Sequence, residues 1–381
     1  MALATTHHAT GAARDQVYKG RGAALNIEGR FERWQREAFD DGWQESAANQ
    51  TADDEGPAPP KTVVTREVAK SIITENDSPD IPFRYSVNPY RGCEHGCIYC
   101  FARPSHAYLG LSPGLDFETR IFAKTNAPEL FRAELSKPSY RCEVISLGIN
   151  TDAYQPCERE YKITRQLLEI AHEFSQPVGL ITKSALIERD LDILVPMAKR
   201  NLVHVTLSVT TQDHHISRYL EPRTAAPARR MQTIKALAAA GVPVGINVAP
   251  VIPFLTDHEM ESLLETGRKM GATTAGYVLL RMPWELKQLF RNWLEQHFPL
   301  KAAHVMSRVQ EMRGGRDVAR DNDPNFGTRM VGQGIFAELL RQRFAKACAR
   351  YDLNNQGRRQ IQRLDCASFA VPGQPVQGAL F

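Results

Sequence analysis

Residues 88–106, NPYRGCEHGCIYCFARPSH, carry three cysteines at the spacing C-x3-C-x2-C, namely Cys93, Cys97 and Cys100. Three thiols within eight residues are too dense for a disulfide framework in a large, non-secreted chain. They can converge on one metal centre if the loop curls. Gly92 and Gly96 permit the curl, because glycine accepts backbone angles that other residues resist. The spacing therefore predicts a metal-binding loop.

Two kinds of metal centre fit this loop. An iron–sulfur cluster is normally held by Cys thiolates, with four ligands for a four-iron cube. The loop lacks a fourth cysteine, which would leave one iron open to bind another molecule, and an open position is where metal chemistry takes place. The alternative is a zinc knot completed by His95 or His106. The spacing favours the cluster over zinc.

An aromatic residue, Tyr99, stands between the second and third cysteines. With it, the loop resembles the signature loop of the radical S-adenosylmethionine (SAM) superfamily. The resemblance implies a [4Fe-4S] cluster whose open iron chelates the amino and carboxylate groups of SAM. It also implies that an electron from the cluster cleaves SAM to a 5′-deoxyadenosyl radical, which abstracts hydrogen from a substrate.

Composition places few limits on function. The 381 residues are 43% hydrophobic and 24% charged, which is ordinary for a soluble protein. The net charge of +4 allows contact with nucleic acid without arguing for it. The chain has no run of eighteen apolar residues and no signal-peptide core, so we expect no membrane partner. Seven cysteines, three of them clustered, suit a reducing cytoplasm, where we expect the protein to reside.

Three parts of the chain differ in composition. The composition of residues 1–61 predicts a largely disordered N-terminal extension. Within it we expect disorder over 1–24, a docking helix over about 29–45 and a Pro-rich linker over 46–61. We expect a core domain over 79–318. Residues 319–381 predict a helix over 335–351, followed by a weakly ordered tail from 352.

Strand-like and helix-like segments alternate through the core. The expected strands are 144–147, 178–181, 202–209, 242–248 and 274–280. The expected helices are 127–135, 158–173, 187–200, 225–240, 257–270 and 283–298. Alternation implies parallel strands with right-handed crossovers. About six units fit, fewer than the eight of a closed barrel, so we predict an α/β fold with an open, partial (β/α)6 barrel. The metal-binding loop follows the first strand and lies at the C-terminal mouth.

Polar residues are crowded in residues 148–156, GINTDAYQP, after the second barrel strand. Such residues position ligands, although Asn, Asp and Thr also cap helices and form turns. Most radical SAM enzymes carry Gly-Gly-Glu here, and this chain does not. It resembles instead the branch related to spore photoproduct lyase, the DNA-repair-photolyase-like proteins, which carry a T/S-D pair. That resemblance implies that Thr151 and Asp152 hold the methionyl end of SAM.

Later strand ends extend the resemblance to about 220 residues. The branch has a T-K pair after the third strand, which implies that Lys183 contacts SAM. Its serine in the fourth strand implies that Ser208 bonds the ribose. The branch also has an E-P pair, which matches residues 221–224 and is followed here by Arg223. Its V-A-P segment, which lies along the adenine, matches residues 247–253. Taken singly, a surface lysine or a strand serine carries little weight.

Two departures separate the chain from spore photoproduct lyases. Those enzymes have a hydrogen-returning Cys where Ile149 stands and a Tyr where Phe101 stands. Lyase activity itself is therefore not expected. Two further thiols, Cys142 and Cys157, lie nearby in the sequence, but free cysteines are more often small buried hydrophobes than reactive groups.

The sequence thus predicts a radical SAM enzyme with an unidentified substrate and an electron donor such as a flavodoxin or ferredoxin. One alternative is a nucleic-acid repair or modification enzyme. It is less favoured, because the late helix offers one short basic stripe, formed by Arg343, Lys346 and Arg350. The other alternative is a metal-binding or redox module without radical chemistry.

Overall fold

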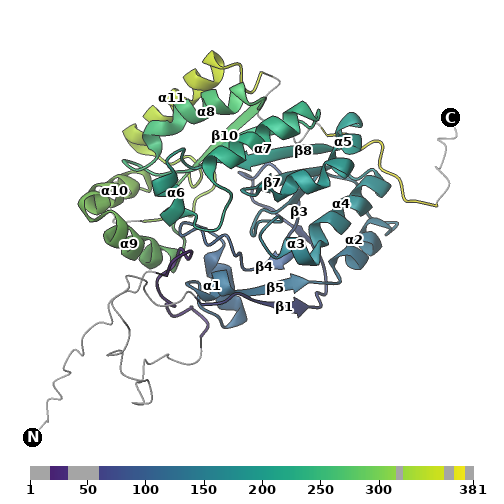
Figure 1. Cartoon of the computed structure of the whole chain (residues 1–381), viewed down its shortest axis with the longest axis horizontal. Helices are drawn as coiled ribbons and strands as arrows, with labels where there is room; N and C mark the ends of the chain where they lie inside the picture. The colour runs from purple at the N-terminus through teal and green to yellow at the C-terminus, as the bar shows by residue number, and fades with distance from the viewer. Residues whose placement is uncertain (1–17, 33–59, 315–320, 356–363, 374–381) are drawn as a thin grey trace, which may run out of the picture.

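The computed structural model describes residues 18–32, 60–314, 321–355 and 364–373. Its centre is a seven-stranded sheet in the order β10-β9-β8-β7-β6-β3-β2. Six of these strands are parallel and follow chain order, while β2 pairs antiparallel with β3 at one edge. Helices lie along the outside of the curved sheet (Figure 1). This arrangement confirms the predicted partial (β/α)6 barrel.

The strands of the large sheet are short and strongly apolar on one face. They are β2 (Ile73–Glu75), β3 (Tyr85–Val87), β6 (Ile145–Leu147), β7 (Val178–Thr182), β8 (Val203–Ser208), β9 (Val244–Val251) and β10 (Thr274–Leu279). The five strands expected from the sequence after the metal-binding loop are all present. Their observed ends differ from the expected ends by at most three residues, because hydrophobicity marks a strand better than it marks its ends.

Five helices cover the barrel strands: α2 (Ala127–Leu135), α4 (Ile163–Phe174), α5 (Leu191–Lys199), α7 (Pro227–Ala239) and α8 (Met260–Lys269). Shorter pieces connect them, namely α1 (Asp116–Thr119), α3 (Glu158–Tyr161), α6 (His214–Leu220) and the 3₁₀ helices η2 (Arg103–Leu109), η3 (Ala185–Asp190) and η4 (Asp257–Glu259). The helix expected over 158–173 is divided at Lys162, whose φ is 50°. The segment expected over 187–200 begins instead as the 3₁₀ helix η3.

The two faces of the barrel sheet differ in chemistry. Ile246 faces α8, since a Cβ on Gly267 would come within 2.8 Å of its side chain, and the Tyr277 ring lies 4.7 Å from Phe344 of α11. Residues in register with these two therefore point outward, and they are mainly large and apolar. The alternate residues face the barrel interior and are mainly small or polar, including Ser86, Ser146, Gly179, His204, Thr206, Ser208, Gly245, Asn247 and Gly276.

A small second sheet, in the order β1-β5-β4, supports the metal-binding loop. Its strands are β1 (Val63–Glu67), β4 (Tyr90–Arg91) and β5 (Arg120–Lys124). Strand β4 directly precedes the loop and pairs antiparallel with β5, which fixes the point where the loop begins.

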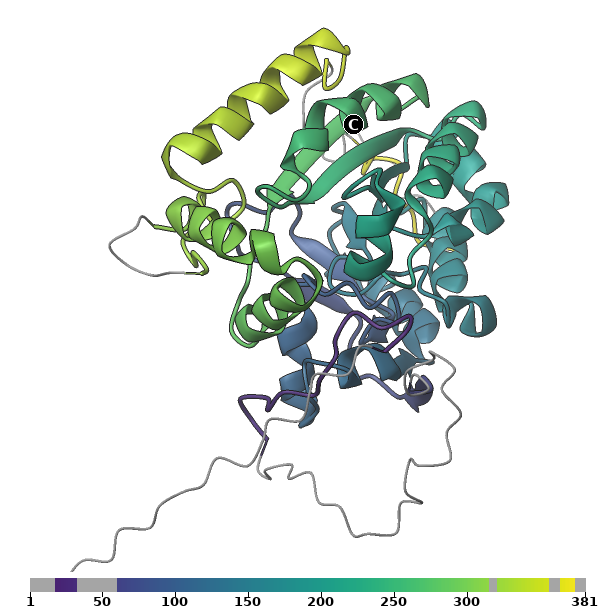
Figure 2. The ribbon, with the colours of Figure 1, turned by 60° about the vertical axis from the view of Figure 1, so that its left-hand side comes forward.

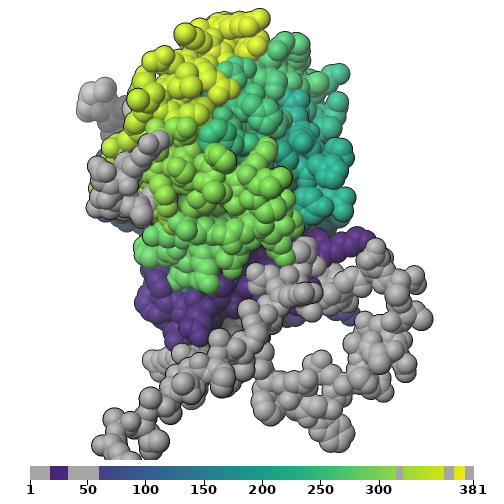
Figure 3. Space-filling view, turned by 90° about the vertical axis from the view of Figure 1, so that its left-hand side faces the viewer, coloured from purple at the N-terminus to yellow at the C-terminus, as the bar shows by residue number. Residues whose placement is uncertain are grey.

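The N-terminal segment 18–32 corrects the expected disorder for residues 18–24, while residues 1–17 lie outside the described residues. Arg21 and Ala23 are buried, and the segment packs beneath the green surface that includes α9 (Figure 3). Residues 29–32 form a turn rather than the start of the expected docking helix, and 33–45 lie outside the described residues. The boundaries proposed for the domains remain a prediction.

The C-terminal third adds three long helices, α9 (Leu286–His297), α10 (Pro299–Met312) and α11 (Gly334–Arg350). The sequence indicated α9 and α11 but missed α10. Helix α11 packs against α8 and α10 on the outside of the barrel (Figure 2). Residues 364–373 are docked rather than weakly ordered, since Leu364 is buried and the Phe369 ring lies 5.3 Å from Tyr140. Among the helices that the structure describes, none is both long enough and apolar enough to cross a membrane.

The His204 side chain, on the inner face of β8, makes stability depend on pH. Its Nε2 lies 3.1 Å from the Thr274 hydroxyl, and burial lowers its pKa to about 4. The unfolded chain therefore binds the proton more readily than the folded chain does between about pH 4 and 6.5. The stabilising contribution is complete above about pH 6.5 and is lost as the pH falls toward 4.

Replacing His204 with Gln should remove this dependence, because the amide cannot titrate but can still bond Thr274. Between pH 7 and pH 5 the wild-type protein should lose about 2 kcal/mol more unfolding free energy than the variant. Denaturant titrations of both proteins at the two pH values measure the difference. Equal losses would show that His204 does not contribute.

Candidate functional site

The metal-binding loop curls at its two glycines, as expected. Gly92 and Gly96 have φ values of 74° and 68°. A Cβ on Gly92 would lie 2.9 Å from the His106 ring, and one on Gly96 would lie 2.7 Å from a Glu118 carboxylate oxygen. Both the backbone angle and the lack of space thus require glycine at these positions. The Cys93 N–H donates to the carbonyl of Phe117, which ties the loop to α1.

The structure gathers the three thiols of the loop. Cys93 and Cys97 are buried, Cys100 is half-buried, and each thiol lies near enough to another to influence its ionisation. Burial raises the pKa of Cys97 to about 12, although the nearby Lys183 charge opposes the rise. Burial also raises the pKa of Cys93 and Cys100. Such thiols stay protonated at neutral pH unless a metal cation displaces the proton.

The residues present fit an iron–sulfur cluster better than a single zinc ion. Among the described residues, no three His, Cys, Asp or Glu side chains, the three cysteines included, are grouped tightly enough around one point to hold a single metal ion. Each candidate for a fourth zinc ligand has one ring nitrogen close to another group, which by itself does not prevent the second nitrogen from binding zinc. His106 Nε2 lies 3.0 Å from the Arg120 carbonyl, and His95 Nδ1 lies 3.3 Å from Asp152. A sulfur-only donor set is typical of the cluster.

A buried ion pair between Arg103 and Glu118 supports the loop from below. Both side chains are fully buried. Arg103 also donates to the carbonyls of Gly96 and Cys97, at 3.0 and 2.9 Å. Glu118 accepts two backbone N–H groups from the N-terminal segment, one of them from Ala23 at 2.8 Å. One carboxylate therefore joins the loop to a segment almost a hundred residues earlier in the chain.

A second buried network holds Tyr99. Its hydroxyl donates to the Glu221 carboxylate and lies 3.2 Å from the Thr210 hydroxyl. Glu221 also forms a fully buried ion pair with Arg230 of α7. Burial opposes the ionisation of Glu221, but the Arg230 and Lys183 charges hold its pKa below the ordinary value. The aromatic residue of the signature loop is thus fixed by hydrogen bonds rather than by packing alone.

Thr151 and Asp152 lie against the metal-binding loop, as the strand order requires. The Thr151 hydroxyl donates to the carbonyl of Tyr90 at 2.9 Å. The Asp152 carboxylate accepts the Thr182 hydroxyl at 2.7 Å and the Lys183 N–H at 2.8 Å. Burial alone would raise the pKa of Asp152, but His95 and these hydrogen bonds lower it to about 2. Asp152 therefore fastens the end of β7 to the loop.

The remaining expected site residues lie at the mouth or inside the barrel. The Lys183 ammonium stands 5.7 Å from the centre of the Tyr99 ring. Ser208 is on the inner face of β8, in register with Asn247 of β9. Arg223 binds Glu94 of the metal-binding loop at 2.9 Å, so this guanidinium is partly occupied by the protein itself. The structure thus brings all nine expected residues to one end of the barrel.

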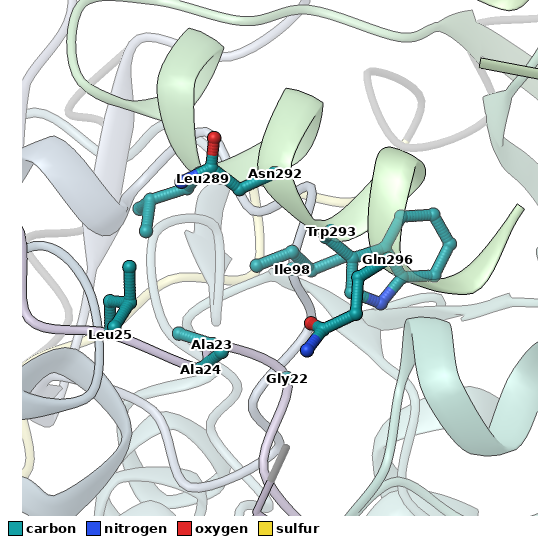
Figure 4. Close-up of a pocket in the computed structure, with 9 residues that line it drawn as sticks. All are labelled: Gly22, Ala23, Ala24, Leu25, Ile98, Leu289, Asn292, Trp293 and Gln296. Atoms are coloured by element: carbon teal, nitrogen blue, oxygen red, sulfur yellow. The ribbon is translucent and has the colours of Figure 1, made fainter. Parts of the chain in front are cut away.

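A small pocket marks where the loop meets the rest of the protein (Figure 4). It separates residues 22–25 from one face of α9, and the side chain of Ile98 reaches into it. The other lining residues are Leu289, Asn292, Trp293 and Gln296. The N-terminal segment and α9 thus cover the loop on the side of Ile98.

The fold and the site together define a class: a partial (β/α)6 barrel with a three-cysteine metal loop at its mouth. A family profile described as the radical SAM superfamily matches residues 87–267. An uncharacterized protein of Mycobacterium tuberculosis is 34% identical over 304 residues, which cover 79% of this chain and 83% of that protein. An uncharacterized protein of Methanocaldococcus jannaschii is 25% identical over 216 residues, covering 57% and 77%. The chain belongs to the radical SAM superfamily.

A solved structure shows the same architecture. Spore photoproduct lyase complexed with dinucleoside spore photoproduct matches with a TM-score of 0.53 and 15% identity, over 76% of this chain and 79% of that chain. A mutant of the same lyase with bound AdoMet and dinucleoside spore photoproduct gives the same values. At this identity the similarity shows a shared fold.

Sequence reasoning missed the residues that support the site. Glu118, Arg103 and Arg230 are fully buried charges whose partners are distant in the sequence or separated by a loop. None of them stands in a recognisable motif. One weak signal was present, since charged residues amid the apolar face of α7 or beside the cysteines are costly unless they are paired.

Replacing Glu118 with Gln tests the support beneath the loop. The change leaves the Arg103 charge buried without its carboxylate and weakens the acceptor for the N-terminal segment. Breaking a buried pair in this way should lower the free energy of unfolding by on the order of 3–5 kcal/mol. Denaturant titration of the anaerobically purified protein measures the loss.

Glu173→Gln is the matched control, because Glu173 pairs with Arg132 on the surface. Exposed pairs contribute no more than about 1 kcal/mol. If both variants lost the same small amount, the Arg103–Glu118 pair would not be what supports the loop.

Proposed function

We propose that this protein is a radical SAM enzyme in which Cys93, Cys97 and Cys100 hold a [4Fe-4S] cluster. Bound there, the cluster would supply the electron that cleaves SAM reductively, and the resulting radical would abstract hydrogen from a substrate. The observation that supports this proposal best is the set of three gathered thiols on a loop in which Tyr99 and Arg103 are held by buried carboxylates. The loop opens toward a barrel interior of small and polar side chains.

The chain's own residues would divide the binding of SAM among several strand ends. Lys183 forms no ion pair within the described part of the chain, so its ammonium is available to a carboxylate. Ser208 and its register partner Asn247 offer hydroxyl and amide groups that suit a ribose. Thr151, Tyr99 and Arg223 complete the set we propose. Asp152 would act by holding the Lys183 backbone in position.

Fewer observations bear on the class of substrate than on the cofactors. A dinucleoside photoproduct is bound by the lyase whose fold this chain shares, and that supports a nucleic-acid substrate as the second candidate. Against it, Arg343 of the expected basic stripe is held by Glu261 at 2.7 Å. Ile149 and Phe101 still stand where the lyases carry Cys and Tyr. We therefore favour a small molecule or a protein side chain, with a low-potential electron donor in a reducing cytoplasm.

Changing Cys93, Cys97 or Cys100 to Ala, one at a time, should abolish the cluster, because thiolates are its anchors. Protein purified without oxygen should be brown and lose its iron in each variant. Iron and sulfide analysis measures the loss. Cys142→Ala and Cys157→Ala are the controls and should keep full iron content. Equal loss in a control would contradict the three-ligand assignment.

Reduced, cluster-replete protein incubated with SAM should form 5′-deoxyadenosine, which chromatography quantifies. Lys183→Met should lower formation at subsaturating SAM by about tenfold, because one charge-assisted contact is worth roughly 1.4 kcal/mol or more. Its iron content should stay unchanged. A replete protein that forms no 5′-deoxyadenosine with several reductants would contradict the proposed reaction.

A further inference from the structure

Arg281 is a partly buried cation at the barrel mouth that the site described above does not use. It follows the end of β10 by two residues, and Leu280 beside it donates its N–H to the Val251 carbonyl at the end of β9. Its Nη1 donates to the Met330 sulfur at 3.4 Å. Its Nε is fully buried and has no hydrogen-bond partner within the described residues. Along the same described ranges, no carboxylate lies within ion-pair distance of it.

The charges around Arg281 do not balance. It shares this corner with two further arginines and with Asp80 and Asp323. Arg329 is bound by both oxygens of Asp80, at 2.7 and 2.5 Å. Asp323 accepts hydrogen bonds from Thr328 and from the N–H of Asn325. Among the described residues, three arginines thus face two aspartates, which leaves one positive charge in excess.

Arg281 and Arg313 both lack an ion pair among the described residues, and the Nε of each is buried without a hydrogen-bond partner there. The two differ because carbonyls hold the guanidinium of Arg313 but not that of Arg281. Arg313, the third arginine, donates to the carbonyls of Leu279, Leu280 and Arg329, which lie at the end of β10 and in the segment beside it. Those bonds give Arg313 a structural role. Burying a guanidinium without a carboxylate costs several kcal/mol, so a protein rarely does so without a compensating partner.

Arg281 is half-buried, and its Nη2 has no hydrogen-bond partner among the described residues. We propose that Arg281 anchors an oxyanion, a carboxylate or phosphate group of the substrate, at the edge of the barrel formed by β10. The planar guanidinium matches either group because both present two oxygens to its fork. Met330 and the Asp80–Arg329 pair would form the wall against which the anion binds.

This placement rests on the proposed function only in assuming that the substrate enters at the mouth. Anion binding can be measured without turnover. Failure of anion binding and failure of SAM cleavage are therefore distinguishable.

The test compares the thermal midpoint of the full-length, cluster-replete protein in sodium phosphate, sodium acetate and sodium chloride at equal ionic strength. We expect phosphate, acetate or both to raise the midpoint above that in chloride, saturating with concentration as binding to the folded state requires. The arm that responds identifies the group. Arg281→Met should weaken the apparent affinity by about tenfold or more.

Arg132→Met is the matched control, since Arg132 already pairs with Glu173, and it should keep the full response. In chloride, Arg281→Met should have a midpoint equal to or above that of the wild-type protein, because the change removes an unpaired buried charge. Three results would overturn the proposal: no oxyanion effect beyond chloride, an undiminished effect in Arg281→Met, or a variant that loses its fold in chloride.

Discussion

The Glu118 carboxylate is the group on which the arrangement of the mouth depends. It is fully buried, and it binds Arg103 from the metal-binding loop and backbone N–H groups from residues 22 and 23. Arg103 in turn binds the carbonyls that turn the loop at Gly96. A charge in that position is stable only when every partner is present. The cysteine loop, η2 and the N-terminal segment therefore hold their positions together or not at all.

The two faces of the barrel strands have different roles, one in packing and one in lining the interior. Outward residues such as Ile246 and Tyr277 are apolar and pack beneath α8 and α11, which holds the fold together. Inward residues such as Ser208 and Asn247 are small or polar. A β strand can serve both tasks because its side chains alternate with a period of two. Only the mouth has to be specialised for chemistry.

The sequence predicted what depends on local pattern. The cysteine spacing, the two turning glycines and the strand-end polar residues lie within short stretches, and the structure confirms the fold they indicated. Part of what it could not predict depends on residues distant in the chain, and part depends on a single backbone conformation or a weak local pattern. The order of segment 18–32 comes from Glu118, and the division of 158–173 comes from one left-handed residue at Lys162. Helix α10 was missed because its apolar stripe is narrow beside that of α9.

The distribution of charge at the mouth suggests why anions would be drawn to it. The buried carboxylates there, Glu118, Glu221 and Asp152, are each held by a cation or by several donors. Lys183 and Arg281, which follow β7 and β10, have no ion-pair partner among the described residues. Because opposite charges attract over several ångströms, an unpaired lysine and an unpaired arginine at different strand ends favour ligands with two separated anionic groups. A carboxylate of SAM at the first and an oxyanion of the substrate at the second would together neutralise the mouth, and the strand order places them on different sides of the barrel interior.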